Sequence, residues 1–186
     1  MSVKLARKLF TTTEYHQMIA AGVFDEDDRL ELIEGEIVEM SPIGPRHVAS
    51  VNRLTEVLGE HIRGLAILSV QNPIQLSDFS EPQPDLTLLK RRSDFYALAL
   101  PTVADVLVAI EVADTTVEKD RGAKIPSYAR AGVAESWLVD LFNNRIEIYS
   151  RPASGVYQEI RVVLRGQPVV STAIPQLQLT ADDILG

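Results

Sequence analysis

The chain of 186 residues contains no cysteine. This absence excludes disulfide bonds, thiolate metal sites and a cysteine nucleophile, and it is typical of a cytoplasmic protein. The chain also lacks an apolar run approaching the ~20 residues that a membrane helix needs, so no membrane association is expected. Residues 1–7 carry charge but no apolar segment follows them, which argues against a signal peptide.

Positive charge is scarce, because 18 Lys and Arg face 26 Asp and Glu, giving a net charge of −8. Such a charge argues against simple electrostatic binding of nucleic acid. A local basic groove is still compatible with an acidic remainder. Two sets of basic residues are candidates for such a groove, the first being residues 90–92, and either set could equally be a solvated surface. The second set comprises Lys119, Arg121, Lys124 and Arg130.

Hydrophobic residues make up 46% and charged residues 24% of the chain, as in ordinary globular proteins. The length is that of one domain with its own core, so we expect a single domain over residues 1–186.

Turn and capping residues predict the first elements. Thr11 and Glu14 have the spacing of a capping box, which predicts a helix there. Apolar and polar residues alternate over 29–40, and Glu34-Gly35 predicts a hairpin turn in the middle. Apolar residues at helical spacing then predict a helix over 46–63.

The remainder of the chain mixes strands with one interrupted helix. The run 106–112 is the most hydrophobic and predicts a central strand. A helix should follow from Asp114 to Gly132, with Pro126 either bending it or starting a second piece. Further strands are predicted at 65–70, 71–76, 86–89, 136–140, 145–149, 157–164 and 174–179. The order predicts an α/β (α+β) fold, with a mixed β-sheet flanked by helices.

Two carboxylates accompany the most apolar strands. Asp85 stands just before the run 86–89, and Glu111 interrupts the run 106–113. Burying an ionised carboxylate costs several kcal/mol unless it is paired or binds a metal. If the two strands are neighbours, about 4.8 Å apart, both carboxylates could share one Mg²⁺ or Mn²⁺. Lys124, in the following helix, could then orient a water or stabilise developing charge.

Each of these residues also has a structural interpretation. Asp85 could be a turn residue, Glu111 the buried partner of an arginine, and Lys124 a surface lysine. His47, near a predicted helix N-terminus, could be a structural residue or could contact a phosphate. Their joint occurrence in this order favours the functional interpretation.

The sequence resembles a known family in several places. Pro84-Asp85 followed by Glu111-Val112-Ala113 is similar to the PD-(D/E)xK nuclease signature. The chain as a whole resembles the Uma-type family of restriction-endonuclease-like proteins, a domain of unknown function abundant in cyanobacteria. The matching pieces are residues 29–37, 40–42 with His47, 84–85, 110–112, Asp120 with Lys124 and Tyr128, and 132–140.

The resemblance implies a restriction-endonuclease-like fold around a four-stranded mixed sheet. It makes Asp85 and Glu111 the metal carboxylates and Glu31 an auxiliary acid. The lysine expected two residues after the glutamate is replaced by Ala113, and the resemblance maps its role onto Lys124.

The leading hypothesis is therefore a Mg²⁺- or Mn²⁺-dependent endonuclease acting on DNA. Asp85, Glu111 and the backbone carbonyl of Val112 would hold the metal, while His47 would contact phosphate. A homodimer is expected, with the hairpin 136–150 as a candidate contact. One alternative is a catalytically inactive nucleic-acid or protein interaction module on the same fold. Another is hydrolysis of a different phosphorylated substrate.

Overall fold

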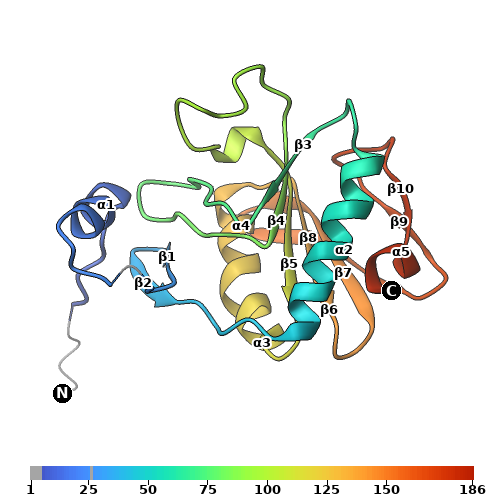
Figure 1. Cartoon of the computed structure of the whole chain (residues 1–186), viewed down its shortest axis with the longest axis horizontal. Helices are drawn as coiled ribbons and strands as arrows, with labels where there is room; N and C mark the ends of the chain where they lie inside the picture. The colour runs from blue at the N-terminus through green and yellow to red at the C-terminus, as the bar shows by residue number, and fades with distance from the viewer. Residues whose placement is uncertain (1–5, 26) are drawn as a thin grey trace.

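A computed structural model describes residues 6–25 and 27–186 of the chain (Figure 1). A mixed sheet of six strands lies at its centre, in the order β3-β4-β5-β6-β7-β8. These strands are β3 (Ile67–Val70), β4 (Leu86–Leu89), β5 (Val106–Ala113), β6 (Glu135–Asp140), β7 (Arg145–Ala153) and β8 (Val156–Leu164). The α/β class and the central position of the 106–112 strand are thus confirmed.

The sheet is mixed because β5 and β6 are parallel while the other neighbouring pairs are antiparallel. Parallel neighbours need a crossover connection, and a helical run between β5 and β6 provides it. The four-stranded sheet implied by the resemblance is too small, since β6, β7 and β8 continue as a meander joined by short turns.

Helices cover both faces of the sheet (Figure 1). On one face, α2 (Pro45–His61) and the short α5 (Ala181–Leu185) pack on apolar side chains that include the fully buried Trp137. On the other face, α4 (Ile125–Ala131) packs its buried Tyr128 against a second apolar cluster. The two clusters form the core, and the sheet separates them.

The crossover run consists of α3 (Val117–Lys119), a π-helical turn η2 (Asp120–Lys124) and α4. In the π-turn the N–H of Ile125 bonds to the carbonyl of Asp120, five residues earlier. Pro126 has no N–H, and in an α-helix its ring would crowd the carbonyl of Gly122. The wider turn relieves that conflict, and α4 begins at Ile125 with Pro126 in its first turn, so the second helical piece starts close to the proline as one of the two alternatives predicted.

The N-terminal segment lies beside the sheet (Figure 1). It contains α1 (Thr12–Ala20), closed by the predicted Thr11–Glu14 capping box, and the hairpin of β1 (Leu30–Ile33) and β2 (Glu36–Glu39). A bridge between Leu32 and Glu81 joins this hairpin to the segment that precedes β4. The hairpin thereby carries Glu31 to the region of Asp85.

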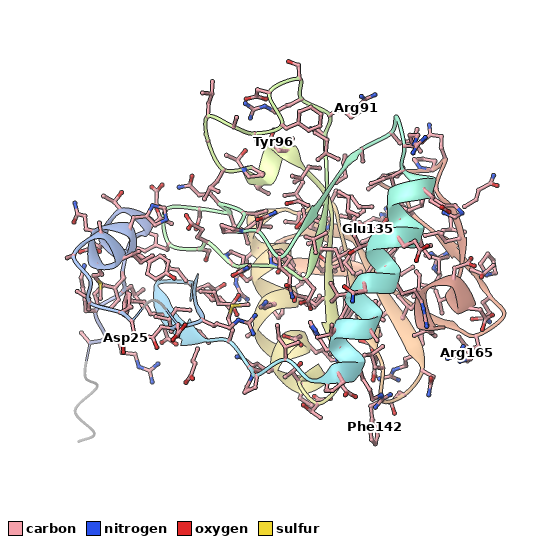
Figure 2. All side chains as sticks on the ribbon, viewed as in Figure 1. Asp25, Arg91, Tyr96, Glu135, Phe142 and Arg165 are labelled. Carbon is pink, nitrogen blue, oxygen red and sulfur yellow. The ribbon has the colours of Figure 1, made fainter. Side chains whose placement is uncertain are left out.

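The C-terminal segment packs on the α2 face through the hairpin of β9 (Pro168–Val170) and β10 (Gln178–Thr180). The fully buried Glu135, labelled in Figure 2, ties it to the sheet. Its carboxylate accepts hydrogen bonds from the Trp137 indole at 2.7 Å and from the backbone N–H of Thr172 at 2.7 Å. A buried carboxylate is tolerable here because the chain supplies these donors.

Several boundaries differ from those predicted. Residues 71–76 form no strand, and the predicted strand at 174–179 is reduced to β10. The hairpin over 136–150 lies inside the sheet, because β8 pairs along β7. The expectation that this hairpin is exposed and available as a dimer contact is therefore wrong, while dimerisation itself stays a prediction. A 3₁₀ turn, η1 (Val103–Asp105), precedes β5. None of the helices described in 6–25 and 27–186 is long and apolar enough to cross a membrane.

Candidate active site

The register of the central strands brings the two predicted carboxylates together. Leu86 pairs with Ile110 and Thr87 with Ala109, so one further step places Asp85 opposite Glu111. Residues that lie opposite each other on antiparallel strands have Cβ atoms about 5 Å apart. The separation therefore suits two carboxylates that share one small cation.

The backbone of Val112 also faces this site. Its N–H donates to Asp85 Oδ2 at 2.9 Å, which replaces a ladder bond that β4 is too short to supply. The carbonyl of Ala113 points to the opposite edge of β5, where it accepts a hydrogen bond from the N–H of Leu141 at 2.9 Å. Because the N–H and C=O of one strand residue point to the same edge, the Val112 carbonyl is directed to the Asp85 side.

Lys124 enters the site from the π-helical turn. Its Nζ lies 3.1 Å from Glu31 Oε2 and 3.2 Å from Glu111 Oε2. It also donates to the Gln83 carbonyl at 3.1 Å. Lys124, Glu31 and Glu111 are all buried, so these ion pairs are shielded from water.

The charges of the cluster do not balance. Burial lowers the pKa of Lys124, but Glu111, Glu31 and further carboxylates outweigh it and raise the pKa above its usual range. Burial raises the pKa of Glu111 well above its usual value, despite the neighbouring ammonium. Burial likewise raises the pKa of Asp120, more than Thr116 and Lys124 lower it. One ammonium thus serves several carboxylates, and the cluster has an excess of negative charge.

His47 contacts Asp85 from the first turn of α2. Its Nε2 lies 2.9 Å from Asp85 Oδ1, while its buried Nδ1 has no hydrogen-bond partner among the described residues. Burial works to raise the pKa of Asp85, but the contacts from His47 and the Val112 N–H outweigh it and lower the pKa below its usual value. Asp85 is therefore held in its ionised form.

These side chains line one pocket of about 200 Å³. Its walls include every residue that the sequence singled out for the site, namely Glu31, His47, Asp85, Glu111, Val112 and Lys124. Arg29 and Lys119 also line it and bring positive charge to its wall. The pocket lies between the β1–β2 hairpin, the α2 N-terminus, the β4–β5 edge and the crossover run.

The sequence analysis assigned no chemical role to two further residues of the cluster. The fully buried Tyr128 hydroxyl donates to Glu111 Oε1, and Asp120 Oδ2 accepts from the Thr116 hydroxyl at 2.8 Å. Burial raises the pKa of Tyr128 well above its usual value, which keeps the hydroxyl a donor. The spacing of Asp120, Lys124 and Tyr128, four residues apart, was the available signal, since such residues share a helix face.

Ala113 explains how a lysine from the crossover run can reach Glu111. Side chains at i and i+2 of a strand share a face, so residues 111 and 113 both point toward the crossover run. Ala113 is fully buried in the apolar cluster beneath α4. Its small side chain leaves room above Glu111, and Lys124 occupies that side.

The donor set suits a hard divalent cation. Asp85, Glu111 and the Val112 carbonyl offer oxygen only, as Mg²⁺ and Mn²⁺ prefer. Asp85 Oδ1 already has contacts with His47 at 2.9 Å and Gln71 Nε2 at 3.4 Å, whereas Asp85 Oδ2 and the two Glu111 oxygens have one contact each and keep a second lone pair. Within the described part of the chain, no three acidic, histidine or cysteine side chains form a metal cage. Mg²⁺ does not require one, because it commonly binds one or two carboxylates and keeps several waters.

The mixed sheet has the architecture of a restriction-endonuclease-like fold, and Asp85, just before β4, meets Glu111 of β5 at one pocket. The Uma2 family, described as "Putative restriction endonuclease", matches residues 12–182, and the chain belongs to this family. No curated protein matches the chain.

A solved structure is similar to the chain along nearly its whole length. It is the crystal structure of "a putative nuclease belonging to DUF820" from Anabaena variabilis ATCC 29413. The two superpose with a TM-score of 0.75 and 18% sequence identity, over 95% of this chain and 97% of the other. At this identity the likeness shows a shared fold.

Proposed function

We propose that the protein is a Mg²⁺- or Mn²⁺-dependent endonuclease that hydrolyses DNA phosphodiester bonds. The observation that carries this proposal is the convergence of Asp85, Glu111 and Lys124 on one pocket, with the lysine Nζ 3.2 Å from the glutamate. The excess negative charge around Lys124 favours binding of a further cation there. The Uma2 family membership supports nuclease chemistry over other hydrolysis.

Asp85, Glu111 and the Val112 carbonyl would hold the metal. When bound, the metal would supply an activated water and neutralise charge on the phosphate. Lys124 would direct a hydrogen bond at the attacking water or at the developing charge. Glu31 holds the ammonium at 3.1 Å, and we assign it to positioning Lys124.

His47 and the pocket wall would orient the substrate. His47 keeps Asp85 in place through Nε2, and its position in the first turn of α2 suits an approaching phosphate. Arg29 and Lys119 add the positive charge that the chain lacks overall. We further propose that the active form is a homodimer, so that two sites would cut opposite strands of a duplex.

The test is cleavage of supercoiled plasmid DNA by the wild type, Asp85→Asn and Glu111→Gln, with Mg²⁺, Mn²⁺ or a chelator. We expect wild-type cleavage in either metal, none with chelator, and a loss of about 100-fold or more in both variants. Asp114→Asn is the matched control, because Asp114 lines the same pocket but pairs with Arg46 at 2.7 Å. Full cleavage by Asp85→Asn or Glu111→Gln would refute the assigned roles.

The alternative is an inactive interaction module on the same fold. The net charge of −8 and the alanine at position 113 favour it. This alternative predicts DNA or protein binding without cleavage in any divalent metal. Calorimetric titration with Mn²⁺, wild type against Asp85→Ala, separates a metal site from a structural cluster of acids.

A further inference from the structure

The β8 strand forms one end of the six-stranded sheet. Within residues 6–25 and 27–186 it pairs with β7 alone. At nine residues it is much longer than the four-residue β3 at the opposite end. Long edge strands are templates for pairing with another chain unless charge, proline or a covering element protects them.

One face of β8 is apolar and exposed. Ile160, Val162 and Leu164 alternate along the strand, and between 47% and 62% of each is exposed. Three such side chains in succession are unusual for a strand that ends in solvent. They indicate a surface that contacts another molecule.

The outward backbone groups of β8 can be assigned from Leu164. Its N–H donates to Gln167 Oε1 at 2.8 Å, and its carbonyl accepts from the Gln167 N–H at 3.1 Å, so both face away from β7. Backbone groups alternate in direction along a regular strand, so those of Ile160 and Val162 face outward as well. The alternation does not extend to Gln158, because Arg151, opposite it at φ +59°, drops out of the β7–β8 register. Ile160 and Val162 therefore offer two N–H and two C=O groups to a partner strand.

The sequence of β8 is complementary to itself when read in reverse. If two copies pair antiparallel around a two-fold axis at Ile160, each position meets the one equally far on the other side. Ile160 then meets its own counterpart, and each Glu159 meets an Arg161. The facing pairs around the axis are Gln158–Val162, Glu159–Arg161 and Ile160–Ile160.

We propose that the occupant of the β8 edge is a second copy of this chain, paired antiparallel with Ile160 at the two-fold axis. The two sheets would then continue into one another. Two intermolecular backbone hydrogen bonds would form between the two Ile160 residues at the axis, since an outward-facing pair exchanges two. Closed two-fold pairing needs one self-complementary surface, which this strand is.

The charged pair sets the register. Glu159 and Arg161 lie on the face opposite the apolar row, and each would meet its counterpart twice in the dimer. Within one chain Glu159 accepts from Arg151 at 2.6 Å, and Arg161 donates to the Val170 carbonyl. A carboxylate has a second oxygen and a guanidinium has five donors, so both can also bond across the axis. A shift by one residue in either direction would place Glu159 and Arg161 opposite uncharged residues, so this register pairs both charged side chains and those neighbouring registers pair neither.

This inference does not rest on the nuclease proposal, because it uses no residue of the pocket. The test is analytical ultracentrifugation of the full chain across a dilution series. We expect wild-type dimers, and weaker dimerisation by about tenfold or more in both Glu159→Arg and Arg161→Glu, where like charges would face each other twice. The double variant Glu159→Arg/Arg161→Glu should recover wild-type dimerisation.

The decisive sample is an equimolar mixture of the two single variants. In a mixed dimer every glutamate again faces an arginine, so the mixture should associate as wild type while each variant alone does not. Melting temperatures of the variants show whether each is folded, and Leu98→Lys, at a side chain 89% exposed elsewhere, is the control for surface charge. A monomeric wild type, or single variants that dimerise as tightly as wild type, would overturn the proposal.

Discussion

Removal of the Lys124 ammonium is the most informative single change. Lys124→Met keeps the length of the side chain but leaves Glu31 and Glu111, each 2% exposed, without their cation. Breaking a buried ion pair by removing one partner costs about 3–5 kcal/mol, because the remaining charge stays buried. In a chain of this length each kcal/mol lowers the melting temperature by about 2–4 °C, so a drop of about 6–20 °C is expected.

The pH dependence of this loss follows from the same contacts. Burial already raises the pKa of Glu111, and loss of the ammonium raises it further. The folded variant therefore holds a proton that the unfolded chain releases above about pH 4.5, so its stability falls as pH rises. The deficit relative to wild type should accordingly be larger at pH 8 than at pH 5.

The assay is urea unfolding at both pH values, followed by circular dichroism. Lys119→Met is the matched control, because Lys119 lines the same pocket and donates at 2.8 Å to the Glu39 carbonyl from an exposed position. Its change should stay within about 0.5 kcal/mol. A deficit below about 1 kcal/mol for Lys124→Met at pH 8 would show that the carboxylates do not depend on the ammonium.

Two further changes test residues next to the elements that form the pocket: Glu147, which binds Arg121 of the π-helical turn, and Gly35 of the β1–β2 hairpin. Burial works to raise the pKa of Glu147, but hydrogen bonds from Arg121 and Tyr149 outweigh it, and the pKa lies below its usual value. The ionised carboxylate therefore stabilises the fold above its unfolded pKa, and this stabilisation is lost as pH falls. Glu147→Gln should cost about 1–2 kcal/mol at pH 7 and less near pH 3, measured by thermal unfolding; an unchanged deficit at both pH values would contradict this. Gly35 has φ +81°, and a Cβ there would lie 2.6 Å from the Leu9 Cβ. Gly35→Ala should cost about 1–3 kcal/mol, and Gly22→Ala, at φ +66° with open space around it, should cost less; equal losses would exclude the contact as the cause.

The identity of most elements was predictable from local sequence. The Thr11–Glu14 capping box, the Glu34-Gly35 turn and the apolar run around Glu111 each depend on neighbours within a few residues. Short-range patterns of this kind report the backbone conformation directly, because helix and strand periodicities differ. The π-turn was one exception, since Pro126 indicated a conflict but not how the helix would resolve it, and the strand predicted at 71–76 was another.

The sequence by itself therefore determined the elements, the presence of a buried carboxylate in the central strand, and the family resemblance. Only the tertiary structure decided that Asp85 meets His47, that Lys124 lies between Glu31 and Glu111, and that β8 rather than the β6–β7 hairpin forms the sheet edge. Those contacts join residues far apart in the chain, and they depend on strand order and register. Periodicity within one segment carries no information about either.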